Sequence, residues 1–244
     1  KRPRIEQFKD ETTEAQTVVR EIMQWIHKRH VQPKDIAILF RTNEQPRPFE
    51  TALREAKLPY VLVGGMSFFD RKEVKDVLAW LRLLDDEPDE ISVLRVINTP
   101  PRGIGKKAVE TLLDHSIKQK VPIWDLVTAH AKRPSLNAAT NRGLDLMAHV
   151  VNSVKAVAAS HSLVDTARKL IANSNYQTEV NRVYSDPEDR QSRWNVVEQM
   201  VNAIGEYEQS ARKPSLTQFL DKLLLGDQDT DNEKEKQLKK NAIG

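Results

Sequence analysis

Apolar residues recur every three or four positions through most of residues 85–225, and no stretch there alternates with the two-residue period of a half-buried strand. This spacing places the apolar side chains of each segment on one face of a helix. The chain also has only 8 glycines among its 244 residues, a composition that favours helices. We therefore expect a mostly α-helical domain over residues 85–225, with helices near residues 135–160, 162–173, 187–211 and 215–225.

The first 84 residues differ, because two short apolar runs alternate with helical segments there. Residues 35–40 and 59–63 read as strands, and the near-continuous apolar character of the first run is typical of a buried parallel strand. Strands that alternate with helices predict a parallel α/β sheet, and two strands are too few to complete one. The apolar faces of the flanking helices are expected to pack on this partial sheet. These helices are predicted at residues 11–29, 48–57 and 71–84.

Charged segments mark the predicted domain boundaries. Residues 85–90 contain five acidic residues and no basic one, so we interpret them as a linker. The end of the chain mixes acidic residues with lysines and shows no apolar face, which predicts a mobile loop. The predicted organisation is an α/β portion at 1–84, a helical domain at 85–225 and a loop at 226–244.

The distribution of charge points to a polyanion as a partner. Residues 95–142 contain nine Lys or Arg residues and three acidic ones, whereas the net charge of the whole chain is only +3. Such a basic zone is compatible with a polyanion-binding face, and equally with a solvated helical surface. No cysteine, signal peptide or membrane-length apolar run is present in the sequence, so the expected location is the cytoplasm, away from membranes.

One turn in this basic zone has the features of a phosphate site. Residues 98–107 read Asn-Thr-Pro-Pro-Arg-Gly-Ile-Gly-Lys-Lys, and helical spacing precedes and follows them. Glycines allow close approach of the backbone to a phosphate, and the following helix N-terminus offers free amides. This arrangement is similar to a helix–hairpin–helix element that binds duplex backbone. The alternative is a purely structural turn. The predicted DNA-binding residues are Thr99, Arg102, Gly103, Ile104, Gly105, Lys106 and Lys107.

Signatures of catalysis are missing from the sequence. Gly105-Lys106 is followed by lysine, and no glycine precedes Gly105 by five positions, so the pattern is not a P-loop. We find neither the spacing of a zinc or calcium site nor a G-x-S-x-G elbow. We predict no catalytic residue, no metal site and no cofactor within these 244 residues.

Three stretches carry a family resemblance. Residues 64–76 read GGMSFFDRKEVKD, which is similar to the G-G-x-x-F-F-x-R-x-E-I-K-D signature of UvrD/PcrA/Rep-type superfamily 1 DNA helicases. Residues 98–105 resemble the N-T-P-x-R-G-I-G element of the same family, which lies where its helical accessory domain contacts duplex DNA. Residues 35–45 resemble its second RecA-like domain.

The resemblance implies that the chain is a fragment of a 3′–5′ ATP-dependent DNA helicase: part of the second RecA-like domain at 1–84 and the inserted accessory domain at 85–225. ATP and Mg²⁺ would bind with the RecA-like domains missing from this sequence, and duplex DNA or a single/double-strand junction would be the nucleic-acid partner. The fragment alone is not expected to hydrolyse ATP. Four further residues are candidates for the DNA or nucleotide side: Arg41, Asn43, Phe68 and Arg71.

Two other functions fit the same sequence. The chain is also compatible with a stand-alone, sequence-independent duplex-binding module. In a third interpretation it is a protein-interaction or autoregulatory domain, in which the basic zone docks an acidic partner.

Overall fold

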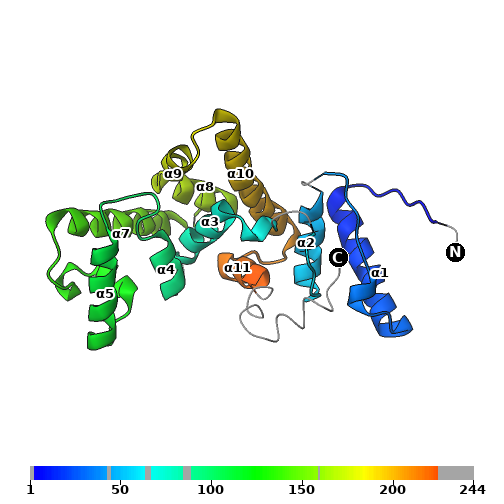
Figure 1. The fold of residues 1–244 in the computed structure, drawn as a ribbon, viewed down its shortest axis with the longest axis horizontal. Coiled ribbons are helices and arrows are strands. Elements are labelled where there is room, and N and C mark those ends of the chain that lie inside the picture. The colour runs from blue at the N-terminus through cyan, green and yellow to red at the C-terminus, as the bar shows by residue number, and fades with distance from the viewer. Residues whose placement is uncertain (1–2, 43–44, 64–66, 85–88, 159, 225–244) are drawn as a thin grey trace. The chain divides into compact units, whose positions relative to one another are not determined.

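The structure, a computed structural model, describes residues 3–42, 45–63, 67–84, 89–158 and 160–224 (Figure 1). The chain forms two compact units and passes between them twice. The first boundary lies between Arg71 and Lys72, and the second lies within helix α11 (Leu216–Leu224). The first unit comprises the described residues up to Arg71 together with those from Leu220 onward. The second unit is Lys72–Phe219.

The first unit is built on two packed helices, α1 (Glu11–Arg29) and α2 (Pro46–Glu55). The Asp10 side chain begins α1 by accepting a hydrogen bond of 2.7 Å from the Thr13 amide. The unit also contains two short 3₁₀ turns, Pro33–Asp35 and Phe68–Asp70, and the last residues of α11. Its buried apolar core consists of Ala15, Val19, Ile22, Ile36, Phe49, Ala52 and Leu53.

The predicted parallel sheet is wrong, because every regular element among the described residues is helical. Side chains of residues 36–40 do alternate: Ile36, Ile38 and Phe40 pack against the first core, whereas Leu39 is 91% exposed. A strand also needs a neighbour to receive its backbone hydrogen bonds. The Ile36 amide instead donates to the Pro33 carbonyl oxygen within a 3₁₀ turn. The apolar run therefore reflects packing on helices, not membership of a sheet in this structure.

The second unit contains the helices that surround the predicted DNA-binding turn. Helix α3 (Lys72–Arg82) packs on α4 (Glu90–Val96), on α8 (Leu163–Asn173) and on α10 (Pro187–Ser210), so its apolar face meets other helices and not a sheet. Helix α7 (Ala138–Ala158) packs on α8 and on α6 (Ile123–Thr128). The remaining elements are α5 (Lys106–Gln119), the 3₁₀ turn His130–Lys132 and α9 (Tyr176–Val183).

Most of the predicted helices of the second unit are confirmed, with small shifts at their ends. Helices α8, α10 and α11 coincide with the predicted segments to within one residue at each end. Helix α7 begins later than predicted, since the Thr140 amide bonds to the side chain of Asn137 and not to Ser135. The short helices α6 and α9 have no counterpart among the predicted helices.

Candidate nucleic-acid interface

Five of the seven predicted DNA-binding residues lie in the turn between α4 and α5, and Lys106 and Lys107 begin α5 itself. The Thr99–Pro100 peptide bond in this turn is cis. Gly103 has a φ of 80°, a conformation that residues with a Cβ atom adopt only at a cost. Gly105 is the N-cap residue of α5, with an ordinary φ of −75°. The two glycines therefore differ in purpose, because only Gly103 needs the freedom of glycine for its backbone angles.

The side chain of Asn98 holds the inner part of the turn. Its Oδ1 atom accepts a hydrogen bond of 2.7 Å from the Arg102 amide and one of 3.3 Å from the Ile104 amide. Thr99, half-buried, contributes its carbonyl oxygen as the acceptor for the indole N–H of Trp80, at 3.1 Å. These bonds tie the turn to α3 and satisfy amides that would otherwise face the interior.

Helix α7 packs against the turn, and the backbone of the turn comes closest to the helix at Gly143. A Cβ atom at this position would overlap the carbonyl oxygen of Arg102 and lie 2.9 Å from Cγ1 of Ile104. One turn earlier on α7, the Thr140 hydroxyl donates to the Gly103 carbonyl oxygen at 3.5 Å. The absence of a side chain at Gly143 therefore lets the turn lie directly on the helix.

Two of the predicted binding residues face inward. Ile104 is only 1% exposed and fills the space between the turn and α7. Arg102 is half-buried, and its guanidinium donates to backbone carbonyl oxygens. Burial lowers the pKa of Arg102 to about 10, and the nearby Glu179 carboxylate acts in the opposite direction.

In contrast to Ile104 and Arg102, residues at the end of the turn and the start of α5 are exposed, and two of them are positively charged. Gly103, Gly105, Lys106 and Lys107 are all exposed. The amides of Gly105, Lys106 and Lys107 donate to no acceptor in the described part of the chain, as expected for the first turn of a helix. Free amides at a helix N-terminus attract anions, and the two lysine ammonium groups add to that field.

The first turn of α5 is also positively charged. It contains two lysines and no acidic residue, whereas acids occupy the first turns of α1 and α10. Cations at this end of a helix are unfavourable by about 0.3–1 kcal/mol each when nothing neutralises them. Lys106 lies 3.9 Å from Glu110, both side chains being largely exposed, so this ion pair contributes little. An anion bound at the turn would neutralise both lysines.

The candidates in the first unit lie apart from this turn in the sequence and have varied surroundings. Arg41 is exposed, and its amide bonds to the side chain of Gln45 at 2.9 Å. Phe68 is 4% exposed and stacks edge-to-face on Phe69, so it belongs to the interior of the unit. Arg71 is half-buried and ends the second 3₁₀ turn. Asn43 lies outside the described residues.

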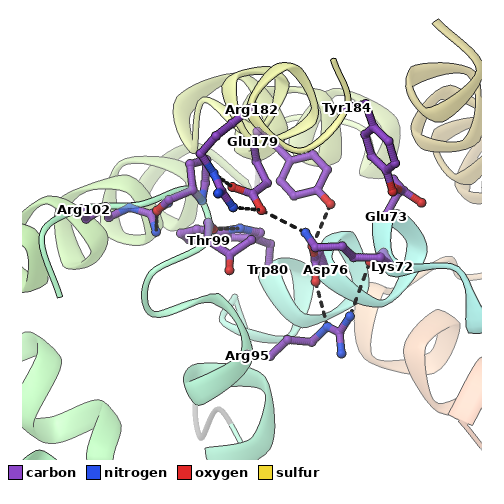
Figure 2. Close-up of polar contacts among 12 residues, drawn as sticks. Lys72, Glu73, Asp76, Trp80, Arg95, Thr99, Arg102, Glu179, Arg182 and Tyr184 are labelled. Atoms are coloured by element: carbon purple, nitrogen blue, oxygen red, sulfur yellow. Dashed lines mark hydrogen bonds and ion pairs between the residues drawn. The ribbon is translucent and has the colours of Figure 1, made fainter. Parts of the chain in front are cut away.

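Ion pairs around two buried carboxylates join α3, α4 and α9 within the second unit (Figure 2). Asp76 is 3% exposed and pairs with Lys72 at 2.7 Å and with Arg95 at 2.9 Å. Glu179, also 3% exposed, pairs with Lys72 at 3.0 Å and with Arg182 at 2.9 Å. Because each carboxylate is paired with two cations, the network offers neither a free general base nor a metal site.

Neither a metal-ligand cluster nor a membrane-spanning helix is found in the part of the chain that the structure describes. No cluster of three or more potential metal ligands occurs there. None of its helices combines the length and the apolar character needed to span a bilayer.

Sequence reasoning missed the residues that hold the turn in place, above all Asn98, Gly143 and Trp80. Gly143 did leave a signal, since a glycine within a segment of helical spacing costs about 1 kcal/mol relative to alanine and so suggests a packing role. Asn98 lies in the matched family element, but its part in bonding two amides depends on the path of the turn.

Comparison with known proteins places the whole chain in one family. The model of the UvrD-like helicase C-terminal domain matches residues 1–243. The ATP-dependent DNA helicase PcrA of Staphylococcus aureus is 30% identical over 220 residues, which cover 88% of this chain and 29% of that protein. PcrA of Staphylococcus epidermidis is 41% identical over 116 residues, or 47% of this chain and 16% of that protein. The chain thus spans less than a third of these relatives. The resemblance is confirmed, and the protein belongs to the UvrD-like helicase C-terminal domain family.

Proposed function

We propose that this chain is part of a 3′–5′ ATP-dependent DNA helicase or translocase, and that the turn at residues 103–107 binds the backbone of duplex DNA near a junction. Family membership and the similarity to the PcrA helicases support the first part. The second part depends on one observation: the exposed, unbonded amides of α5 lie beside Lys106 and Lys107.

The contacts of this turn favour phosphate over base edges. Backbone amides and short glycine segments bind phosphate oxygens well, and lysine acts as a flexible point charge. The side chain of Ile104 is buried, so it is not available to insert between bases. Binding of this type is independent of sequence and strongly weakened by salt.

We propose that ATP and Mg²⁺ bind mainly through RecA-like domains of the parent protein outside this sequence. The sequence has no P-loop, and the described residues hold no cluster of metal ligands. Arg41 remains the candidate of this chain for the nucleotide side, since its side chain is exposed at the end of the apolar run of residues 36–40. ATP hydrolysis by the 244-residue chain alone is not expected.

A titration of forked duplex and of single-stranded DNA over a salt series tests the DNA-binding part. The test variant is the double substitution Lys106→Gln/Lys107→Gln, and the matched control is Lys118→Gln/Lys120→Gln near the other end of the same helix. If each removed lysine had neutralised one phosphate, the slope of log affinity against log salt becomes shallower by about 0.9 per lysine. The control changes the net charge equally and should bind nearly as the wild type does.

Two outcomes would contradict the proposal. Equal weakening by both double variants would indicate attraction by net charge alone, without a site at the turn. Absence of binding to any DNA at low salt would favour the protein-interaction function, in which the basic zone docks an acidic partner.

A further inference from the structure

Arg102 makes its polar contacts inside the second unit. Its guanidinium donates to the carbonyl oxygens of Val96 at 3.1 Å and of Pro100 at 3.0 Å, and more weakly to that of Ser174 at 3.5 Å. These acceptors come from the end of α4, from the turn itself and from the residue that ends α8. A single side chain thus joins three separate pieces of backbone.

An aromatic ring lies against this guanidinium. The Cζ atom of Arg102 lies 4.7 Å from the centroid of the Trp80 ring, within the range of a cation–π contact. Trp80 is 1% exposed, and its indole N–H donates to the Thr99 carbonyl oxygen at 3.1 Å. Figure 2 shows Trp80, Thr99 and Arg102 together, next to the ion pairs of Glu179. Trp80 therefore contacts both the side chain of Arg102 and the backbone of the turn.

Planar geometry matters for these contacts. A guanidinium has five N–H donors in a fixed plane, so it can serve several carbonyl oxygens while it stacks on a ring. A lysine ammonium has the same charge but is compact and strongly hydrated, and it cannot match the arrangement of acceptors seen around Arg102. Partial burial of the Arg102 charge costs free energy, which its hydrogen bonds to carbonyl oxygens offset. Such an arrangement fits a side chain that holds the backbone in place.

We propose that Arg102 is a positioning residue for the DNA contact: it fixes the turn from inside, so that the free amides of α5 form a rigid phosphate site, and does not itself bind phosphate. This inference rests on the proposed function of the turn. It reverses the expectation from sequence, in which the Arg102 charge was grouped with Lys106 and Lys107 as a direct DNA contact.

The two possible roles of Arg102 predict different DNA affinities for the Arg102→Lys variant. If Arg102 bound phosphate directly, lysine would keep the charge and most of the affinity. If Arg102 positions the turn, then Arg102→Lys and Arg102→Gln both lose the carbonyl contacts, and both bind forked duplex roughly tenfold more weakly than wild type. The control variant Lys107→Gln removes an exposed cation and should leave the structure of the turn unchanged.

Amide hydrogen exchange of the DNA-free chain gives a second readout. We expect both Arg102 variants to accelerate exchange at residues 102 and 104, the amides held by Asn98, whereas Lys107→Gln leaves these rates unchanged. Thermal unfolding of each variant establishes that it is folded. If Arg102→Gln does not fold, Arg102→Lys alone decides between the two roles.

Wild-type affinity in Arg102→Lys, together with unchanged exchange at residues 102 and 104, would overturn the inference. Failure of the proposed function would appear differently, as an absence of DNA binding or of any effect of the Lys106/Lys107 double variant. The exchange rates would still report whether Arg102 orders the turn.

Discussion

Gly143, in the second turn of α7, lies so close to the carbonyl group of Arg102 that a Cβ atom at position 143 would overlap the carbonyl oxygen. The helix and the turn are therefore in backbone contact. This contact makes Gly143 part of the proposed DNA site although it bears no functional group.

Substitution of Gly143 by alanine tests this contact. The added methyl group must displace the turn, and such overpacking typically destabilises a protein by about 1–3 kcal/mol. We expect Gly143→Ala to lower the free energy of unfolding by an amount in this range and to weaken binding to forked duplex. Chemical denaturation and fluorescence anisotropy measure the two effects.

Gly205 in α10 provides the matched control. A Cβ atom there would lie 3.3 Å from Cγ2 of Val164, which is the end of a side chain and not backbone. Alanine has a higher helix propensity than glycine by about 1 kcal/mol, which offsets a slight shift of the valine. Gly205→Ala should be neutral or stabilising and should not change DNA binding. Equal destabilisation by both substitutions would exclude a special role for Gly143.

The two glycines of the turn are expected to respond differently to substitution. Gly103→Ala forces a residue with a Cβ atom to a φ of 80°, at a cost of about 1–2 kcal/mol. Asparagine tolerates this region better, so Gly103→Asn should recover part of the loss. Gly105→Ala should cost less than Gly103→Ala, since nothing lies within 4 Å of an added Cβ atom and φ is ordinary. If Gly105→Ala proved the more damaging for stability, the backbone conformation of the turn would have to be different.

The lowered pKa of Glu179 predicts that the stability of the fold depends on pH. Burial alone would raise its pKa, but hydrogen bonds and charges from Arg182 and Lys72 hold the pKa below the ordinary value of 4.5. A lowered pKa means that the folded state binds fewer protons than the unfolded state. The stabilisation is therefore complete above the unfolded pKa and is lost as pH falls through the folded pKa.

Glu179→Gln should remove this stabilisation. We expect the variant to be less stable than wild type at neutral pH by about 1–3 kcal/mol, and the difference to shrink in acid below about pH 4. Urea unfolding over a pH series measures it. The exposed Glu110→Gln, also on the second unit, serves as the control and should show a much smaller difference at neutral pH. A difference for Glu179→Gln that stayed constant from neutral to acid would contradict the pKa argument.

The first unit offers a comparable test at Glu50, which is 3% exposed. Its carboxylate accepts hydrogen bonds from the Tyr60 hydroxyl at 2.9 Å, from the Ser67 hydroxyl and from the Phe68 amide at 3.2 Å. Burial, followed by the Glu50 charge, raises the pKa of Tyr60 to about 12. Glu50→Gln puts an NH₂ group among these donors, and we expect a loss of about 1.5–3 kcal/mol.

A double-mutant cycle with Tyr60→Phe isolates the Glu50–Tyr60 contact. The two substitutions should be non-additive, because Glu50→Gln replaces the charged acceptor of this hydrogen bond and Tyr60→Phe removes its donor. Additive losses would mean that Tyr60 contributes to stability independently of Glu50.

Helical elements were predictable from local patterns, whereas the sheet was not. The helix α1 matches its prediction because its apolar spacing, its Asp10 cap and its positive-φ end at His30 all act within one segment. The run at residues 35–40 has the composition of a strand, but strand pairing depends on a second segment that a local pattern does not reveal. In the structure only one face of that run is covered.

The proposed DNA site was predictable in position but not in the role of each residue. Its glycines and lysines mark the turn in the sequence. The inward direction of Arg102 was not predictable, since it depends on Trp80 and on the carbonyl group of Ser174, 72 residues further along the chain. Charge alone does not distinguish a cation that meets solvent from one that stacks on a buried ring.

The exposed side chain of Leu39 has a practical consequence for work with this chain in solution. It stands beside Ile38 and Phe40, which are packed against the first core, and is itself 91% exposed. An exposed apolar residue in a β-prone run favours self-association as protein concentration rises. Leu39→Lys places a charge at this position without touching the packed side chains, so it should extend the concentration range in which the chain stays monodisperse.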